Sequence, residues 1–260
     1  ALRQGQASVV EHYPLSRLLD VYSKVCDAVA YAHSKGIIHR DLKPANIMIG
    51  EFGEVMVMDW GISKILNQPE SRMLPVEPFT PKEGTQYGTI MGTPSFMAPE
   101  QAAGQLEIIN ERTDIYSLGA ILYNILTLRP PITGSSTNAK VMEQIKSGQI
   151  SSPIAFTNDS NDATVLIHCP DHQIPEALSA VAMQALSKEQ SERYPDIHSL
   201  QRDVAAFTAG YAPKAEKAGL FRQMRLTVRR HAILAAASSV VILLTLIFAS
   251  HAYWSERQQS

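Results

Sequence analysis

The stretch His39-Arg-Asp-Leu-Lys-Pro-Ala-Asn46 decides the fold, because it places a carboxylate, an ammonium group and an amide in one short loop. Asp41 can accept a hydroxyl proton or orient the hydroxyl, Lys43 can neutralise a transferring phosphoryl group, and Asn46 can offer an oxygen to a metal ion. Thirteen residues after Asn46 comes Asp59-Trp-Gly61, whose carboxylate can hold Mg²⁺ across the same cleft. This set of groups suits phosphoryl transfer.

The segments around this loop show which elements carry it. Apolar residues at helical spacing predict a helix over 15–34, which Gly36 closes. Two short apolar runs, 47–49 and 54–58, predict a hairpin. The proline-rich stretch 62–99 reads as a loop that is functional or disordered. Further helices are expected over 114–126, 138–147, 175–186 and 196–207, with a loop insertion over 151–173.

The composition sets limits on the class of protein. The 260 residues are 45% apolar and 18% charged, so a sizeable core can form and wholesale disorder is excluded. Two cysteines cannot build a disulfide framework, which favours a reduced compartment. The net charge of −2 hides a basic end, because five arginines and one glutamate follow residue 220. An acidic body with a basic tail is not typical of a nucleic-acid binder, so we expect no nucleic-acid partner.

Several motifs in the correct order resemble the eukaryotic-type serine/threonine protein kinases. The run from His39 to Asn46 matches the catalytic loop, and Asp59-Trp-Gly61 matches the metal-binding triplet with Trp in place of Phe. Gly92-Thr-Pro-Ser-Phe-Met-Ala-Pro-Glu100 matches the end of the activation segment. Asp114 matches the buried aspartate of the central helix, and Arg193 the late arginine that pairs with Glu100.

The resemblance implies ATP and Mg²⁺, or Mn²⁺, as cofactors and Ser or Thr of proteins as the acceptor. By this resemblance Asp41 is the catalytic base and Lys43 the lysine typical of serine/threonine kinases. Asn46 and Asp59 are then the metal ligands, and Met48 touches the adenine from below. Together, Lys43, Asn46, Met48 and Asp59 form the implied nucleotide-binding set.

The resemblance also assigns residues outside the nucleotide site. Thr93 is implied as part of the substrate platform, where it bonds the catalytic aspartate and lysine. Thr89 is the first candidate for the activation-loop phosphosite and Thr85 the second, and Arg40 would pair with the phosphate. Structural rather than catalytic roles are expected for His39, Arg40, Glu100, Asp114 and Arg193.

The resemblance covers residues 1–208, in which we find no glycine-rich G-x-G-x-x-G loop and no strand lysine in a V-A-I-K context. The expected fold class is therefore mainly α: a kinase-like C-terminal lobe, a helical bundle with a small β-hairpin, that lacks the N-terminal lobe and is followed by one transmembrane helix. Without the lobe that covers the ATP phosphates, we expect this chain by itself to bind ATP weakly and to transfer phosphate poorly.

The C-terminal part predicts a membrane anchor. Residues 209–231 are expected to be a basic juxtamembrane linker, and 232–250, which carry no charge, a transmembrane helix. Arg229-Arg230 before this run and Tyr253-Trp254 after it are typical of the two membrane interfaces. The kinase part should then be cytoplasmic and residues 251–260 a short extracytoplasmic tail, in a single-pass protein of the cell membrane. This order resembles bacterial receptor-type kinases, for which self-association for autophosphorylation is a further expectation.

Two alternatives stay open at this point. A membrane-anchored pseudokinase scaffold would have no physical need to keep Asp41, Lys43, Asn46 and Asp59 together, which argues against it. A kinase of small molecules could use the same loop, but the segment ending at Glu100 is typical of a platform for a polypeptide substrate.

Overall fold

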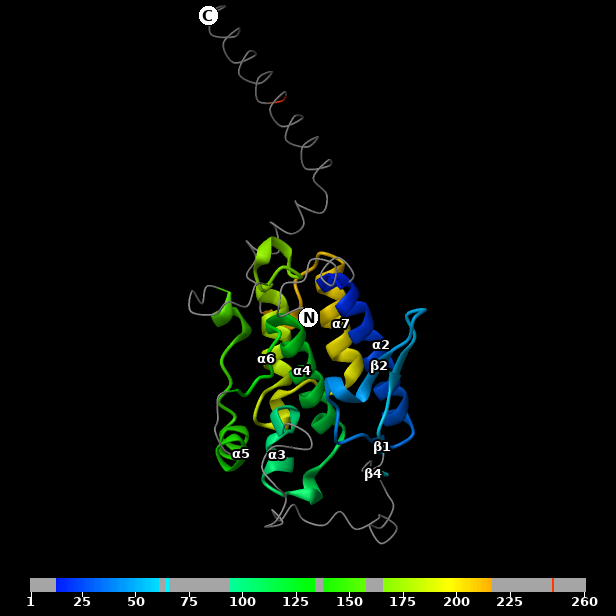
Figure 1. The fold of residues 1–260 in the computed structure, drawn as a ribbon, viewed down its shortest axis with the longest axis vertical. Coiled ribbons are helices and arrows are strands. Elements are labelled where there is room, and N and C mark those ends of the chain that lie inside the picture. The colour runs from blue at the N-terminus through cyan, green and yellow to red at the C-terminus, as the bar shows by residue number, and fades with distance from the viewer. Residues whose placement is uncertain are drawn as a thin grey trace, which may run out of the picture.

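The computed structural model describes residues 13–60, 64–65, 94–133, 138–157, 166–216 and 245. These residues are mainly helical, and their helices pack around one buried core (Figure 1). The α-helices are α2 (Leu15–Ser34), α3 (Pro99–Ala102), α4 (Glu111–Thr127), α5 (Asn138–Ser147), α6 (Glu176–Ala185) and α7 (Ile197–Thr208). The strands are β1 (Ile37–Ile38), β2 (Ile47–Ile49), β3 (Val55–Val57) and β4 (Lys64–Ile65).

Helix α4 runs through the middle of the bundle, as its nearly all-apolar sequence predicts. It begins at Glu111, earlier than the residue 114 predicted from apolar periodicity, because Asn110 caps it by accepting a hydrogen bond from the Arg112 N–H. Helix α6 packs closely on α4 at Gly119, where a Cβ would lie 2.6 Å from the Cβ of Ala185. A glycine at this point therefore lets the two helices approach.

Helices α2 and α7 lie side by side along one flank of α4 (Figure 1). Helix α2 has the predicted bounds, and the hydroxyl of its buried Tyr22 donates 3.2 Å to the carbonyl of Leu118 on α4. The side chain of Gln201 on α7 donates 2.7 Å to Asp27 on α2. Cys26 on α2 is a buried free thiol, and burial raises its pKa, so the thiol stays protonated.

The predicted hairpin is confirmed as the antiparallel pair of β2 and β3, with Ile47 opposite Val57 and Met48 opposite Met56. Gly53 supplies the positive φ of 84° that the turn requires. A second pair, in which Ile38 lies opposite Lys64, was not predicted, because strands of two residues carry no measurable alternation. This second pair joins the chain just before His39 to residues 64–65, which follow Asp59 in the sequence.

The transmembrane helix of the expected fold class is not found among the described residues. No helix in the described stretches is both long enough and apolar enough to cross a membrane. The longest of them, α2, carries Arg17, Asp20 and Lys24 among its charged residues. The predicted span over 232–250 lies outside the described residues except for Thr245, as do the tail over 251–260 and the linker from residue 217 onward.

Candidate active site

Asp114 anchors the loop that contains the predicted catalytic residues. This fully buried carboxylate on α4 accepts the backbone N–H of His39 at 2.8 Å and that of Arg40 at 2.9 Å. A ring nitrogen of His33 on α2 lies 2.8 Å from the same carboxylate. A buried carboxylate needs such donors to offset its lost hydration. The structure therefore places Asp114 where it holds the backbone of the loop at two consecutive N–H groups.

Arg40 has left-handed backbone angles, with φ of 70°, directly before Asp41. Such a conformation costs a residue with a side chain roughly 1–2 kcal/mol, so neighbouring contacts must hold it. Its N–H is bonded to Asp114, and its carbonyl accepts 2.7 Å from the side-chain amide of Gln101. The backbone that leads into Asp41 is thus fixed from two helices.

His39 is fully buried and links this loop to the Asp59 segment. Its Nδ1 accepts the N–H of Asp41 at 3.2 Å, and its Nε2 lies 2.9 Å from the carbonyl of Met58. These partners assign the ring proton to Nε2, which donates to that carbonyl. His39 therefore lies between Asp41 and the residue before Asp59 and contacts both.

Trp60, the departure from the family triplet, fits this arrangement. Its ring centroid lies 4.5 Å from that of His39, at an interplanar angle of 54°. Its indole N–H donates 2.9 Å to the carbonyl of Val57, so the extra polar group that Trp brings has a partner. The larger ring is accommodated without an orphaned donor.

Asp41, Lys43 and Asn46 converge on one carboxylate oxygen. The Nζ of Lys43 lies 2.5 Å from Asp41 Oδ2, and the Nδ2 of Asn46 lies 3.2 Å from the same oxygen. Asn46 Nδ2 also donates 2.7 Å to the Asp41 carbonyl. Asp41 keeps 34% of its side chain exposed and Lys43 keeps 21%. Among the described residues no donor is paired with Asp41 Oδ1, so this oxygen is the one that can take a proton from a substrate.

Met58, the residue before Asp59, places Asp59 close to the catalytic loop. The N–H of Met58 donates 2.8 Å to the carbonyl of Asn46, so the end of β3 lies against the end of the catalytic loop. Asp59 itself is exposed and has a left-handed φ of 64°. The structure therefore joins, by backbone hydrogen bonding, the two segments that the sequence predicted to converge.

The donor set fits a hard divalent cation. Asn46 commits its amide nitrogen to Asp41, which leaves its Oδ1 as the available end, and Asp59 supplies a carboxylate. Mg²⁺ prefers oxygen ligands, and it is often held by only one or two protein groups together with phosphate oxygens and water. The described stretches contain no group of three or more His, Cys, Asp and Glu side chains that could hold a metal. A site completed by a nucleotide agrees with both observations.

Met48 lies on the outward face of the hairpin. The opposite face, with Ile47 and Val57, packs against the core, whereas Met48 is 49% exposed and has the similarly exposed Met56 as its cross-strand partner. The pair forms a small apolar surface of the kind that can contact a flat ring. Thr85, Thr89 and Thr93, the other predicted site residues of the activation segment, lie outside the described residues.

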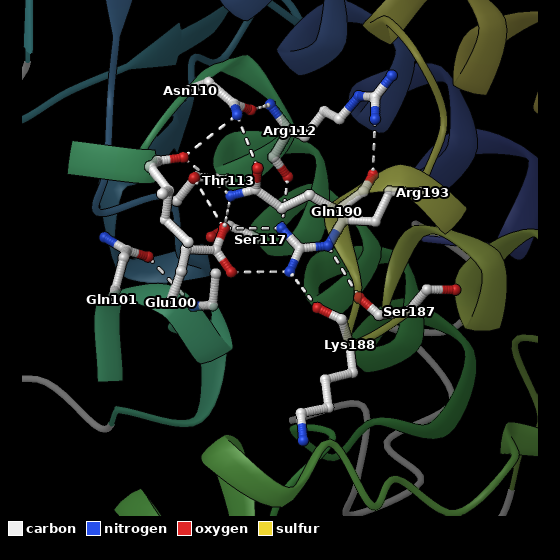
Figure 2. A network of polar contacts seen from close by, with 12 residues as sticks. Glu100, Gln101, Asn110, Arg112, Thr113, Ser117, Ser187, Lys188, Gln190 and Arg193 are labelled. Atoms are coloured by element: carbon white, nitrogen blue, oxygen red, sulfur yellow. Dashed lines mark hydrogen bonds and ion pairs between the residues drawn. The ribbon is translucent and has the colours of Figure 1, made fainter. Parts of the chain in front are cut away.

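Glu100 and Arg193 form a buried, two-pronged ion pair (Figure 2). Arg193 NH1 reaches Glu100 Oε1 and NH2 reaches Oε2, each at 2.8 Å. The remaining donors of Arg193 go to the carbonyls of Arg112, Ser187 and Lys188. Burial by itself raises the pKa of Glu100, but the hydrogen bonds and charge of Arg193 outweigh it and lower that pKa.

Three residues that the motif search missed extend this network. Thr113 and Gln190 each donate to Glu100 Oε1, at 2.8 and 2.9 Å, and Asn110 donates 2.7 Å to the Gln190 side chain (Figure 2). Asn110 could have been found as a helix cap. Gln190 carries no sequence signal, because its role depends on the chain that folds against it.

Gln101 is a further residue that the sequence interpretation missed. Its Oε1 accepts the Ala98 N–H at 3.1 Å, and its Nε2 donates 2.7 Å to the Arg40 carbonyl. A glutamine three residues after the residue that precedes a helix is half of a capping box, and that signal could have drawn attention to it. The bond to Arg40, which lies 61 residues earlier, has no sequence signature.

A family comparison agrees with this geometry. The sequence model of the protein kinase domain matches residues 7–203, and the chain therefore belongs to the protein kinase family.

Its curated relatives lie among the bacterial serine/threonine kinases. Serine/threonine-protein kinase PknD of Protochlamydia amoebophila (strain UWE25) is 37% identical over 197 residues, which cover 74% of this chain and 18% of the relative. Serine/threonine-protein kinase PknB of Mycolicibacterium smegmatis (strain ATCC 700084 / mc(2)155) is 35% identical over 201 residues, which cover 77% of this chain and 28% of the relative. The chain thus spans less than a third of the length of these relatives.

The match corrects the fold class expected from the sequence. The expectation of a kinase C-terminal lobe without its N-terminal lobe was wrong, because the protein kinase domain match begins at residue 7 and continues to residue 203. That expectation relied on the absence of the glycine-rich loop and the strand lysine, whereas the family match extends over residues 7–203. The expectation of poor phosphate transfer rested on the missing lobe and is dropped with it. The pseudokinase alternative gains no support, since the relatives carry the names of kinases.

Proposed function

We propose that the protein transfers the γ-phosphoryl group of ATP to Ser or Thr side chains of proteins. The observation that carries this proposal is the convergence of Asp41, Lys43 and Asn46 on one oxygen, with the Asp59 segment bonded to Asn46. Membership of the protein kinase family supports the same reaction. Each of these residues has its own role in the reaction.

Asp41 orients the acceptor hydroxyl and takes its proton. Its Oδ2 is occupied by Lys43 and Asn46, so Oδ1 faces the substrate. As the hydroxyl oxygen forms its bond to the γ-phosphorus, the bond from that phosphorus to the bridging oxygen breaks, and ADP leaves with the electron pair. The hydroxyl proton passes to Asp41, which balances the charge on the acceptor side.

Lys43 places a positive charge beside Asp41 and the transferring group. Its Nζ has three donors, of which the contact with Asp41 uses one. The remaining donors can bond oxygens of the phosphoryl group, where negative charge is spread in the transition state. This ammonium group therefore steadies the base and reduces the repulsion between the base and the phosphate.

Asn46 and Asp59 would hold Mg²⁺, or Mn²⁺, which would neutralise phosphate charge and orient the nucleotide. Asn46 is suited to this because Asp41 takes its amide nitrogen and leaves Oδ1 as the available end. Met48 supplies the apolar contact for the adenine ring, consistent with its exposed position opposite Met56. Thr93 is assigned to the substrate platform, Thr89 or Thr85 to the activating phosphosite, and Arg40 to pairing with that phosphate, all from the motif resemblance.

The matched experiment uses the purified chain with radiolabelled ATP and a set of Ser-, Thr- and Tyr-containing peptides. We expect label on Ser and Thr but not on Tyr, and a loss of about 10²-fold or more in kcat for Asp41→Asn, which keeps shape but removes the base. Asp27→Asn is the control, because Asp27 is an exposed aspartate on α2 whose carboxylate accepts a hydrogen bond from Gln201. Equal turnover by Asp41→Asn and the unaltered chain would overturn the proposal.

The location is proposed from the sequence. The charge-free stretch 232–250 beside Arg229-Arg230 supports a kinase domain that faces the cytoplasm at the cell membrane, where ATP is available. Proteins are the proposed substrates, and a second copy of the chain is the proposed partner for phosphorylation of the activation segment. Fractionation of cells that produce the full chain tests the location, since recovery in the soluble fraction contradicts it.

A further inference from the structure

Gln101 makes two hydrogen bonds that join segments far apart in the sequence. It lies in α3, directly after Glu100, and its Oε1 accepts the N–H of Ala98. Its Nε2 donates to the carbonyl of Arg40 at 2.7 Å. One neutral side chain therefore touches both the end of the activation segment and the loop that carries Asp41.

The bond to Arg40 acts on the peptide group that precedes Asp41. The Arg40 carbonyl and the Asp41 N–H belong to the same planar unit. Gln101 holds the carbonyl side of that plane, and Nδ1 of His39 holds the N–H side at 3.2 Å. Rotation of the plane would turn the Asp41 side chain, so these two contacts together set the direction of its carboxylate.

The bond to Ala98 acts on residues 94–98, which we call the platform segment. Its 3₁₀ turn η4 (Pro94–Phe96) is fixed to the core, since Ser95 donates 3.0 Å to the Ile132 carbonyl and Ser117 donates 2.9 Å to the Phe96 carbonyl. The segment ends at Ala98, where Gln101 takes the N–H. A rigid platform segment and the base Asp41 are thus connected through one glutamine.

We propose that Gln101 is a positioning residue that sets the carboxylate of Asp41 relative to the platform segment. The inference rests on the proposed function, because Asp41 acts as a base only if the protein is a kinase. Gln101 touches no reacting atom in this role. It acts through the Arg40–Asp41 peptide, and its loss changes turnover more than nucleotide binding.

The test compares Gln101→Glu, Gln101→Ala and the control Gln201→Ala in the full chain. Glutamate keeps an acceptor for Ala98 but, when ionised, has no donor for Arg40, so it breaks only one of the two contacts. Gln201 also makes side-chain hydrogen bonds, to Asp27 and to the Ser23 carbonyl, but between α7 and α2. We expect kcat to fall about tenfold in both Gln101 variants, while KM for ATP stays within about twofold. In Gln201→Ala, kcat and KM should be unchanged.

The pH profile separates positioning from general destabilisation. Glutamate has an ordinary pKa of about 4.3, and its protonated form is shaped like glutamine and can donate to the Arg40 carbonyl. The kcat of Gln101→Glu relative to the unaltered chain should therefore rise as the pH falls from 8 to 5. A flat ratio together with an unchanged kcat overturns the proposal.

A readout independent of turnover separates this inference from the function. Hydrogen–deuterium exchange of the peptide covering residues 39–46 should speed up severalfold in Gln101→Ala and stay unchanged in Gln201→Ala. If the unaltered chain shows no turnover, the proposed function fails, and exchange alone decides the coupling. Equal exchange over residues 39–46 in the unaltered chain, Gln101→Ala and Gln201→Ala contradicts the inference even if the chain is an active kinase.

Discussion

The backbone N–H of Met58 donates a 2.8 Å hydrogen bond to the carbonyl of Asn46. This contact joins the end of β3 to the end of the catalytic loop, and it puts Asp59 next to the residue with which it is proposed to share a metal ion. His39 supports the same junction, because its ring also bonds the carbonyl of Met58. The metal-ligand geometry therefore depends on Met58, a residue that supplies only backbone groups to it.

Asn46→Ala should lower the apparent affinity for Mg²⁺ in the phosphorylation reaction more than it lowers the stability of the fold. The change removes the amide oxygen proposed as a ligand and both contacts of Nδ2 with Asp41. We expect the Mg²⁺ concentration for half-maximal phosphorylation to rise about tenfold or more, as for loss of groups that tune a metal site. A Mg²⁺ titration of kinase activity measures it. An unchanged titration midpoint would exclude Asn46 as a ligand.

Arg193→Met should destabilise the chain by about 3–5 kcal/mol. Both side chains of the pair are buried, at 0% and 3% exposed, so removal of the arginine leaves Glu100 as an uncompensated buried charge. Urea denaturation measures the loss. Arg202→Ala is the matched control, because Arg202 is exposed and donates to the Ser199 hydroxyl at the surface, and it should cost less than about 0.5 kcal/mol.

The double change Glu100→Leu and Arg193→Met sharpens this prediction. With both charges gone, no buried ion is left unpaired, so the double variant should lose less free energy of unfolding than Arg193→Met alone. If the double variant is less stable than Arg193→Met by the full cost of Glu100→Leu alone, the two side chains act independently. That result would contradict the prediction.

His168 should make stability fall in mild acid. Burial lowers its pKa, which the hydrogen bond to the Ile125 carbonyl only partly offsets. The folded state therefore binds a proton less readily than the unfolded state, whose histidine has its ordinary pKa of about 6.5. Its contribution to stability is present above that value and decreases as the pH falls below it, by up to about 1.4 kcal/mol per pH unit.

Urea midpoints between pH 7.5 and 5.5 measure this effect. His168→Gln keeps a donor for the Ile125 carbonyl but cannot titrate, so it should flatten the decrease. His198→Gln is the control, since His198 is exposed and its ring lies 3.3 Å from the Gln201 side chain on the same helix. A pH dependence that is as steep in His168→Gln as in the unaltered chain contradicts the assignment.

Gly119→Ala should disturb the contact between α4 and α6. The added Cβ would lie 2.6 Å from the Cβ of Ala185 and 3.2 Å from its carbonyl carbon, closer than packed atoms tolerate. We expect a loss of about 1–3 kcal/mol in thermal unfolding. Adding Ala185→Gly removes the nearer clash and should restore part of the loss. No recovery in the double variant would show that another contact is responsible.

The elements with strong local signals could be predicted from the sequence. Helix α2 and helix α5 have the bounds that their apolar periodicity indicates, and the hairpin of β2 and β3 pairs as its two short runs suggest. The pair of β1 and β4 and the short helix α3 were missed, because two to four residues carry no readable period. Helix α4 begins earlier than predicted because the Asn110 cap outweighs the charged residues that open it.

The sequence by itself determined the chemistry of the catalytic loop. Asp41, Lys43 and Asn46 are neighbours along the chain, so a tight loop of that length must bring their side chains together. Other contacts that hold that loop in place depend on how the whole chain folds. Gln101 contacts Arg40 across 61 residues, and His33 contacts Asp114, which bonds the backbone of that loop, across 81. Such bonds follow from the way helices pack, and packing is set by the whole core rather than by any local pattern.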